Sequence, residues 1–277
     1  VSSGTIECGV SAPFYWGSKH KAIPFFCSVP GGMTAREIFS WLIHFDGQEL
    51  WDNLYSSFNL KGLPMGETGT TMGGWYNKEI NKITDFSGIK MRIPGLGAEV
   101  VSRLGVTALN VPGNEVINSL KLGIIDAAEW AGPWPDRAMG FHKVAKYYYG
   151  PGIHEPSTLN EFIINKKVWE SLPLNLQEII KNACYSNYIE GLSESFSNNA
   201  RTLKLLKNES NIKIRNFSNE IVKEMFKVSY DVVKENTKIN SDYRTIFNSW
   251  RSTIQLFNEY HNYSEKKYLD YRISAFK

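Results

Sequence analysis

Cysteine is scarce in this chain of 277 residues. Cys8, Cys27 and Cys184 are its only thiols, and no two of them are spaced as Cys-x-x-Cys. Zinc ribbons and thioredoxin-like redox motifs are therefore excluded. A disulfide between Cys8 and Cys27 is compatible with an oxidising compartment. We favour three buried free thiols, because free cysteine usually behaves as a small hydrophobic residue.

Excess charge of one sign and long apolar runs are also missing. The chain has 31 Lys and Arg against 28 Asp and Glu, a formal net charge of +3. That balance, without a basic run interleaved with aromatics, argues against a nucleic-acid partner. No apolar stretch approaches the roughly 18 residues needed to span a bilayer. With 42% hydrophobic and 13% aromatic residues, the chain can bury a large core and form more than one lobe.

Motifs for covalent chemistry are absent as well. The sequence has no nucleophile elbow, no His-Asp-Ser set and no phosphate-binding loop. Gly95-Leu-Gly97 follows a predicted strand but lacks the third glycine of a dinucleotide fingerprint. An enzyme would have to rely on a pair of carboxylates. Glu129 with Glu155 is the one pair that invites this reading, and it could serve a glycosidase-like site if the two groups were held about 5 to 10 Å apart.

Short apolar segments alternate with amphipathic ones along the chain, which predicts an α/β fold. Asn175, with Glu178 three residues later, is the predicted N-cap of a long helix. The predicted strands are 6–10, 90–93, 124–126, 159–164 and 212–215. The predicted helices are two within 34–59, separated near Gly47, and single helices at 97–104, 114–122, 175–206 and 220–234.

Three charged residues stand where extended segments run into glycine and proline. Arg92 lies before Pro94, Glu129 before Gly132, and Glu155 before Pro156. Such positions often place side chains in clefts, so they suggest a site for an anion with a cation beside it. The residues alone leave structural roles open: Arg92 could pair with Asp85 or Glu99, and the two glutamates could be surface acids. We leave His154 out of the site, because a lone histidine in such a loop is more often only hydrogen-bonded.

Four segments have a recognisable wording: 68–75 (TGTTMGGW), 88–95 (GIKMRIPG), 125–133 (IDAAEWAGP) and 146–152 (KYYYGPG). They resemble the solute-binding proteins of tripartite ATP-independent periplasmic (TRAP) transporters, and most of all the subgroup that binds 2-oxo monocarboxylates such as pyruvate with a metal ion. The resemblance implies a periplasmic binding protein of two lobes, each a mixed sheet flanked by helices, with the ligand in the cleft between them.

The resemblance also assigns roles to residues. Arg92 would clamp the ligand carboxylate, while Glu129, the Trp130 carbonyl and Glu155 would surround a sodium or calcium ion, which prefers oxygen ligands. Thr71 stands where the subgroup usually has glutamine. It would offer ligand and cation only a backbone carbonyl and a hydroxyl of shorter reach. Tyr15 would donate its hydroxyl to the substrate.

The resemblance further implies an assembly. One lobe would contain 1–63 and 157–205, the other 64–156 and 206–277. Roughly sixty residues, about two strands and two helices, would precede Val1 in such proteins, so we interpret the sequence as a fragment. The ligand would pass to the membrane permease subunits of a TRAP transporter. Two alternatives to this transport function stay open: the enzyme considered above and a ligand-sensing extracytoplasmic domain with the same fold.

The carboxyl-terminal segment carries an apolar stripe. Ile246, Trp250, Ile254, Phe257 and Tyr260 recur at steps of three and four residues, which predicts one helix, or two if Asn262 interrupts it. The stripe could pack on its own lobe. In the resembling subgroup this helix reaches a second subunit, so we expect a homodimer.

Overall fold

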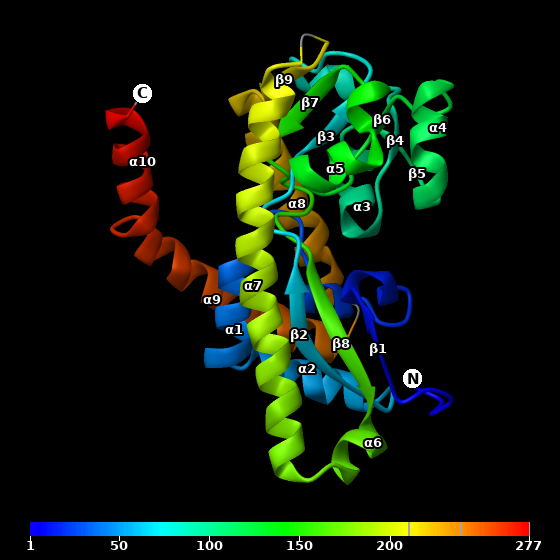
Figure 1. Cartoon of the computed structure of the whole chain (residues 1–277), viewed down its shortest axis with the longest axis vertical. Helices are drawn as coiled ribbons and strands as arrows, with labels where there is room; N and C mark the ends of the chain where they lie inside the picture. The colour runs from blue at the N-terminus through cyan, green and yellow to red at the C-terminus, as the bar shows by residue number, and fades with distance from the viewer. Residues whose placement is uncertain (210, 239, 277) are drawn as a thin grey trace.

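Two β-sheets, stacked end to end along the long axis of the molecule, organise the fold (Figure 1). The structure, a computed structural model, describes residues 1–209, 211–238 and 240–276. In the smaller sheet, the order is β1 (Cys8–Ser11), β8 (Leu159–Asn165), β2 (Leu60–Glu67). In the larger sheet the order is β5 (Thr107–Leu109), β4 (Lys90–Arg92), β6 (Ala127–Ala128), β3 (Gly74–Tyr76), β7 (Tyr147–Gly150), β9 (Lys213–Asn216). The two-lobed α/β class predicted from the sequence is confirmed.

The smaller sheet is antiparallel throughout its described strands, whereas we expected a mixed sheet in each lobe. Central β8 pairs with β1 on one side and β2 on the other. Helix α2 (Gly47–Ser56) packs on β2, and α1 (Ala35–His44) packs on α2. Their aromatic residues form the core of this lobe: Phe26 stacks on Trp41 and Trp51, and all three are fully buried. The predicted interruption of 34–59 near Gly47 is therefore correct.

The larger sheet is mixed and has a separate core on each face. Strands β5, β4 and β6 are parallel, while β3 is antiparallel to β6 and β7. Because side chains alternate along a strand, Tyr148 and Tyr149 of β7 belong to different cores. Helices α3 (Gly95–Arg103), α4 (Val116–Lys121) and α5 (Pro133–Met139) complete this lobe.

Helix α7 (Leu174–Lys207) spans both lobes, and α6 (Lys166–Ser171) precedes it (Figure 1). The 34 residues of α7 make that helix about 50 Å long. It packs against β2 in one lobe and against α5 in the other. The predicted N-cap at Asn175 is wrong. Pro173 occupies the cap position and the helix starts at Leu174, because the fixed φ of proline suits the start of a helix.

The last helices divide between the lobes. Helix α8 (Asn219–Glu235) contributes Ile221 and Met225 to the core of the larger sheet. Helix α9 (Ser241–His261) instead packs on α1 and α2, and its apolar stripe enters the core beside Phe25. This packing differs from the expected placement of all of 206–277 in the second lobe. The aromatic core of the first lobe covers Ile246 and Trp250, whereas Tyr260 at the end of the stripe is exposed.

Helix α10 (Glu265–Ala275) follows α9 after the predicted interruption at Asn262 and projects away from the body (Figure 1). None of its residues is buried.

All three cysteines are free, as favoured, but only Cys27 and Cys184 are buried, while Cys8 is exposed. Across the described residues, no helix has both the length and the apolar character required to cross a membrane.

Candidate ligand and cation site

A cavity of about 450 Å³ lies between the two lobes and contains all three charged residues singled out from the sequence. Arg92 ends β4 and Glu129 follows β6, its parallel neighbour. Carboxyl ends of parallel strands meet at one edge of a sheet, which is where α/β proteins place ligands. The cavity is lined by Val10, Ser11, Ala12, Phe14, Tyr15, Thr68, Arg92, Pro94, Glu129, Trp130, Ala131, Pro135, Glu155, Thr158 and Asn160.

Arg92 is held by Glu129 and Trp130. Its Nη1 donates to Glu129 Oε1 at 2.6 Å and to the Glu129 carbonyl at 3.0 Å. The guanidinium lies 5.1 Å from the centre of the Trp130 ring, within cation–π range. Neither structural partner considered above is used: Asp85 accepts from backbone N–H groups, and Glu99 pairs with an arginine on its own helix. Arg92 lines the cavity, and its hydrogen bonds to Glu129 use only Nη1.

Glu129 is almost fully buried, with 2% of its surface exposed. Besides Arg92 it meets His154, whose Nε2 lies 3.4 Å from Glu129 Oε2. His154 is buried as well, so leaving it out of the site missed a direct neighbour of the key carboxylate. The only sequence signal was its position beside Glu155, and nothing in the sequence places that loop against β6.

Glu155 is a second carboxylate on this cavity and is partly buried. Its Oε1 accepts a hydrogen bond from the Thr158 hydroxyl. Burial, followed by the negative charge of Glu129, raises the pKa of Glu155, while Thr158, His154 and Arg92 oppose that rise. The two glutamates are therefore electrostatically coupled, and a cation between them would relieve their repulsion.

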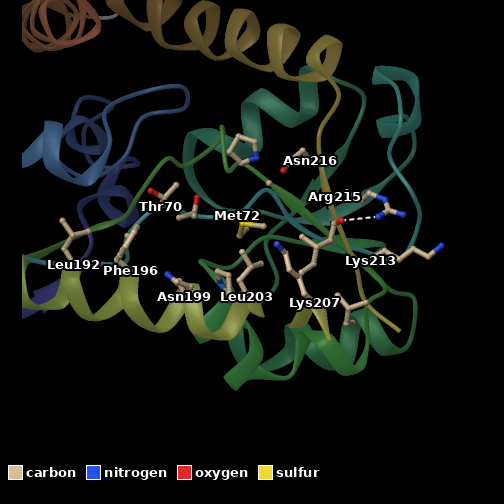
Figure 2. A pocket seen from close by; sticks show the side chains of 18 residues that line it. Thr70, Met72, Leu192, Phe196, Asn199, Leu203, Lys207, Lys213, Arg215 and Asn216 are labelled. Atoms are coloured by element: carbon tan, nitrogen blue, oxygen red, sulfur yellow. Dashed lines mark hydrogen bonds between the residues drawn. The ribbon is translucent and has the colours of Figure 1, made fainter. Parts of the chain in front are cut away.

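Thr71 is turned away from this cavity. Its hydroxyl donates to the Glu155 carbonyl, its own carbonyl accepts from the Gly152 N–H, and its N–H donates to the Pro156 carbonyl. It lines a larger hollow of about 800 Å³ between α7 and β9, where Met72 lies among side chains from both elements (Figure 2). In this conformation Thr71 supports the loop of Glu155.

Tyr15 lies on the wall formed by the first lobe. It is 61% exposed and packs its ring against Phe14. The same short 3-10 turn is anchored by Trp16, whose Nε1 donates to Glu161 Oε1 at 3.1 Å. The aromatic loop predicted from the sequence thus reaches the cavity from the lobe opposite Arg92.

The described residues hold no group of three or more His, Cys, Asp or Glu side chains able to bind a metal. Glu129 and Glu155 supply two carboxylates, so further ligands would have to be backbone oxygens, water or the bound solute. Such an all-oxygen donor set fits sodium or calcium.

Three further carboxylates are buried near the site with neutral donors as partners. Burial raises the pKa of Glu67 to about 8 and those of Asp136 and Glu161 to about 7. Hydroxyl groups of Tyr188, Tyr148 and Tyr55 donate to these carboxylates in turn.

A protein-family model, "Bacterial extracellular solute-binding protein, family 7", matches residues 1–239. The chain belongs to this family. It is 35% identical over 275 residues to a monocarboxylate 2-oxoacid-binding periplasmic protein of Nostoc sp., covering 99% of this chain and 75% of that one. Family members are solute receptors, so the enzyme alternative is not supported, and the protein is a periplasmic solute-binding component of a TRAP transporter.

Two solved structures are also similar. A TRAP solute-binding protein from Pseudoalteromonas atlantica, with bound sodium and pyruvate, has a TM-score of 0.91 at 36% identity, covering 98% of this chain and 82% of that one. One from Bordetella bronchiseptica, a mixed-occupancy dimer with calcium and picolinate, has a TM-score of 0.94 at 32% identity, covering 99% of this chain and 82% of that one.

Glu67 provides a test of the buried carboxylates through pH. Its pKa is about 8 in the folded protein, against about 4.3 for a free glutamate. The folded state therefore binds the proton more tightly, and this stabilisation is complete below the unfolded pKa and is lost as pH rises through the folded one. We expect Glu67→Gln, which mimics the protonated form, to raise the melting temperature by a few degrees at about pH 9 but not at about pH 5.

The measurement is thermal unfolding by circular dichroism across that range. Glu190→Gln, at an exposed position of α7, is the matched control and should leave the profile unchanged. A Glu67→Gln profile parallel to that of the wild type would contradict the assignment.

Proposed function

We propose that the protein binds a small 2-oxo monocarboxylate, such as pyruvate, together with a sodium or calcium ion in the cavity between its lobes. The observation that carries this proposal is the convergence of Arg92, Glu129 and Glu155 on one cavity. Both similar structures hold a small carboxylate and a metal ion. The loaded protein would deliver its solute to the transporter permease.

Arg92 is the proposed carboxylate clamp. A guanidinium presents a planar fork of N–H donors that matches a carboxylate and stays charged at physiological pH. Only Nη1 is engaged by Glu129, which leaves donors of the fork for the ligand. Closure of the lobes would remove water from this pair and strengthen it.

Glu129, Glu155 and the Trp130 carbonyl are the proposed cation ligands. When the cation is bound, it supplies a fixed positive charge that orients the ligand. The two glutamates and a ligand carboxylate carry three formal negative charges. Arg92 and a divalent cation balance them, whereas sodium leaves one negative charge over. Calcium is therefore the better electrostatic match if both glutamates are ionised.

Thr71 and Tyr15 have supporting roles in this proposal. Thr71 holds the Glu155 loop through its hydroxyl and would meet ligand or cation only if its carbonyl were released from Gly152. Tyr15 lines the cavity from the first lobe and would close over the apolar end of the ligand.

The direct test is a calorimetric screen of small carboxylates, with and without added sodium or calcium, that includes 2-oxo, 2-hydroxy and dicarboxylic acids. We expect pyruvate and related 2-oxoacids to bind and dicarboxylates not to bind. Tight binding of a dicarboxylate alone would contradict the proposed ligand class.

Arg92→Lys is the sharper variant, because lysine retains the charge beside buried Glu129 but loses the fork. We expect the affinity for pyruvate to fall at least about tenfold. The control is Arg103→Lys, which changes an arginine of α3 paired with Glu235 at the surface. Calorimetry giving equal pyruvate affinity for wild type and Arg92→Lys would refute the clamp.

We also propose that the protein forms a homodimer through its carboxyl-terminal helix. α10 buries none of its residues, and Tyr268, Tyr271, Ile273 and Phe276 are each more than half exposed. Apolar side chains arrayed on a projecting helix favour a protein partner. In a twofold exchange each helix would cover the other subunit.

Deletion of 263–277 tests the dimer without disturbing a core, because the last buried residue of α9 is Thr253. We expect the intact chain to have dimer mass by light scattering and the shortened chain to be a folded monomer. Monomer mass for the intact chain at micromolar concentration would overturn this proposal.

A further inference from the structure

A buried carboxylate behind the cavity has no part in the binding scheme above. Asp136 lies on α5 and is 1% exposed. Its Oδ1 accepts from the Ala131 N–H at 3.0 Å, and its Oδ2 accepts from Trp75 Nε1 at 2.9 Å and from the Tyr148 hydroxyl at 2.8 Å. Two donors thus come from strands β3 and β7, and the third comes from the segment that carries Glu129 and Trp130.

The bond to Ala131 has a geometric consequence for Trp130. The N–H of Ala131 and the C=O of Trp130 belong to one peptide unit, which is planar and trans, so the two groups point in opposite directions. Asp136 holds the N–H on the buried side, beside Trp75 and Tyr148. The Trp130 oxygen is therefore directed away from that core, and both Trp130 and Ala131 line the cavity.

The Trp130 carbonyl differs from the carbonyls of Glu129 and Ala131 because it accepts no hydrogen bond from the described residues. The Glu129 carbonyl accepts from Arg92 Nη1, and the Ala131 carbonyl accepts from the Met72 N–H at 2.8 Å. Among the hydrogen bonds found within 1–209, 211–238 and 240–276, none ends on the Trp130 oxygen. A carbonyl with no internal donor, on the same cavity as the carboxylates of Glu129 and Glu155, has the character of a ligand for a hard cation.

We propose that Asp136 is the positioning residue of the cation site: it fixes the Trp130 peptide so that its carbonyl faces the ion. When Asp136 is ionised, its negative charge on the N–H side also polarises the amide and makes the carbonyl oxygen a better donor to a cation. This inference rests on the proposed function and assigns a role to a residue that touches neither ligand nor ion. Outer-shell partners of this kind typically contribute about 10- to 100-fold to metal affinity.

A purely structural role for Asp136 must be separated from positioning, because the residue also ties α5 to two strands. Asp136→Asn keeps the shape, but an amide has only one oxygen, so it cannot accept from Ala131 on one side and from Trp75 and Tyr148 on the other. The amide oxygen is expected to face the two donors Trp75 and Tyr148, which turns its NH2 group toward the Ala131 N–H and removes that bond. Tyr148→Phe removes a donor from the same carboxylate and leaves the Ala131 bond in place. Both variants perturb the same buried cluster, so their melting temperatures measure the structural contribution.

The experiment is calorimetric titration of calcium into each full-length variant without any carboxylate, supported by terbium luminescence excited through tryptophan. We expect Asp136→Asn to weaken calcium binding at least about tenfold, and Tyr148→Phe to change it by less than about twofold. The terbium signal should fall with Asp136→Asn at a concentration that saturates the wild type.

Calcium affinity unchanged in Asp136→Asn would overturn the positioning role. Equal losses in both variants, in proportion to their melting temperatures, would also overturn it by assigning Asp136 to stability alone. A wild type that binds pyruvate but no cation would overturn the cation part of the proposed function and this inference with it, while leaving the Arg92 clamp intact.

Discussion

The ion pair between Arg92 and Glu129 is the interaction around which the site is built. Arg92 is only 13% exposed and Glu129 only 2%, so neither charge could be buried there without the other, because an unpaired buried charge costs several kcal/mol. The pairing depends on β4 and β6 being parallel neighbours that end together. The sheet thus places opposite charges at the mouth of a cleft that a small anion can enter.

The surroundings of this pair rely on neutral donors. Asp136 and Glu161 accept hydrogen bonds from tyrosine and tryptophan groups, and Glu67 accepts one from Tyr188 at Oε2 while its buried Oε1 has no partner. Because these donors are neutral, they bring no positive charge that would compete with Arg92 for an anion. Among the described residues that line the cavity, Arg92 is the only lysine or arginine. A bound metal ion is then the natural complement to Glu129 and Glu155.

Sequence patterns predicted much of this arrangement, since helical periodicity and glycine or proline punctuation are local signals. The helices on either side of Gly47, strand β8 and the cleft position of Arg92 follow from them. β6 was misplaced, because its two residues Ala127 and Ala128 carry no β-branched signal. The packing of α9 on the first lobe and the contacts of His154 and Asp136 depend on long-range chain folding that a local pattern does not contain. The roles of the site residues remain predictions.

The central claim is that one cavity binds a carboxylate and a cation jointly, so each should strengthen the binding of the other by the same factor. The most direct measurement is calorimetric titration of pyruvate in sodium-free buffer, once with a chelator and once with saturating calcium, followed by the reverse titration of calcium with and without pyruvate. We predict that calcium raises the pyruvate affinity at least about tenfold, and that pyruvate raises the calcium affinity equally. Pyruvate binding that is indifferent to calcium, and to sodium in a parallel titration, would contradict the account.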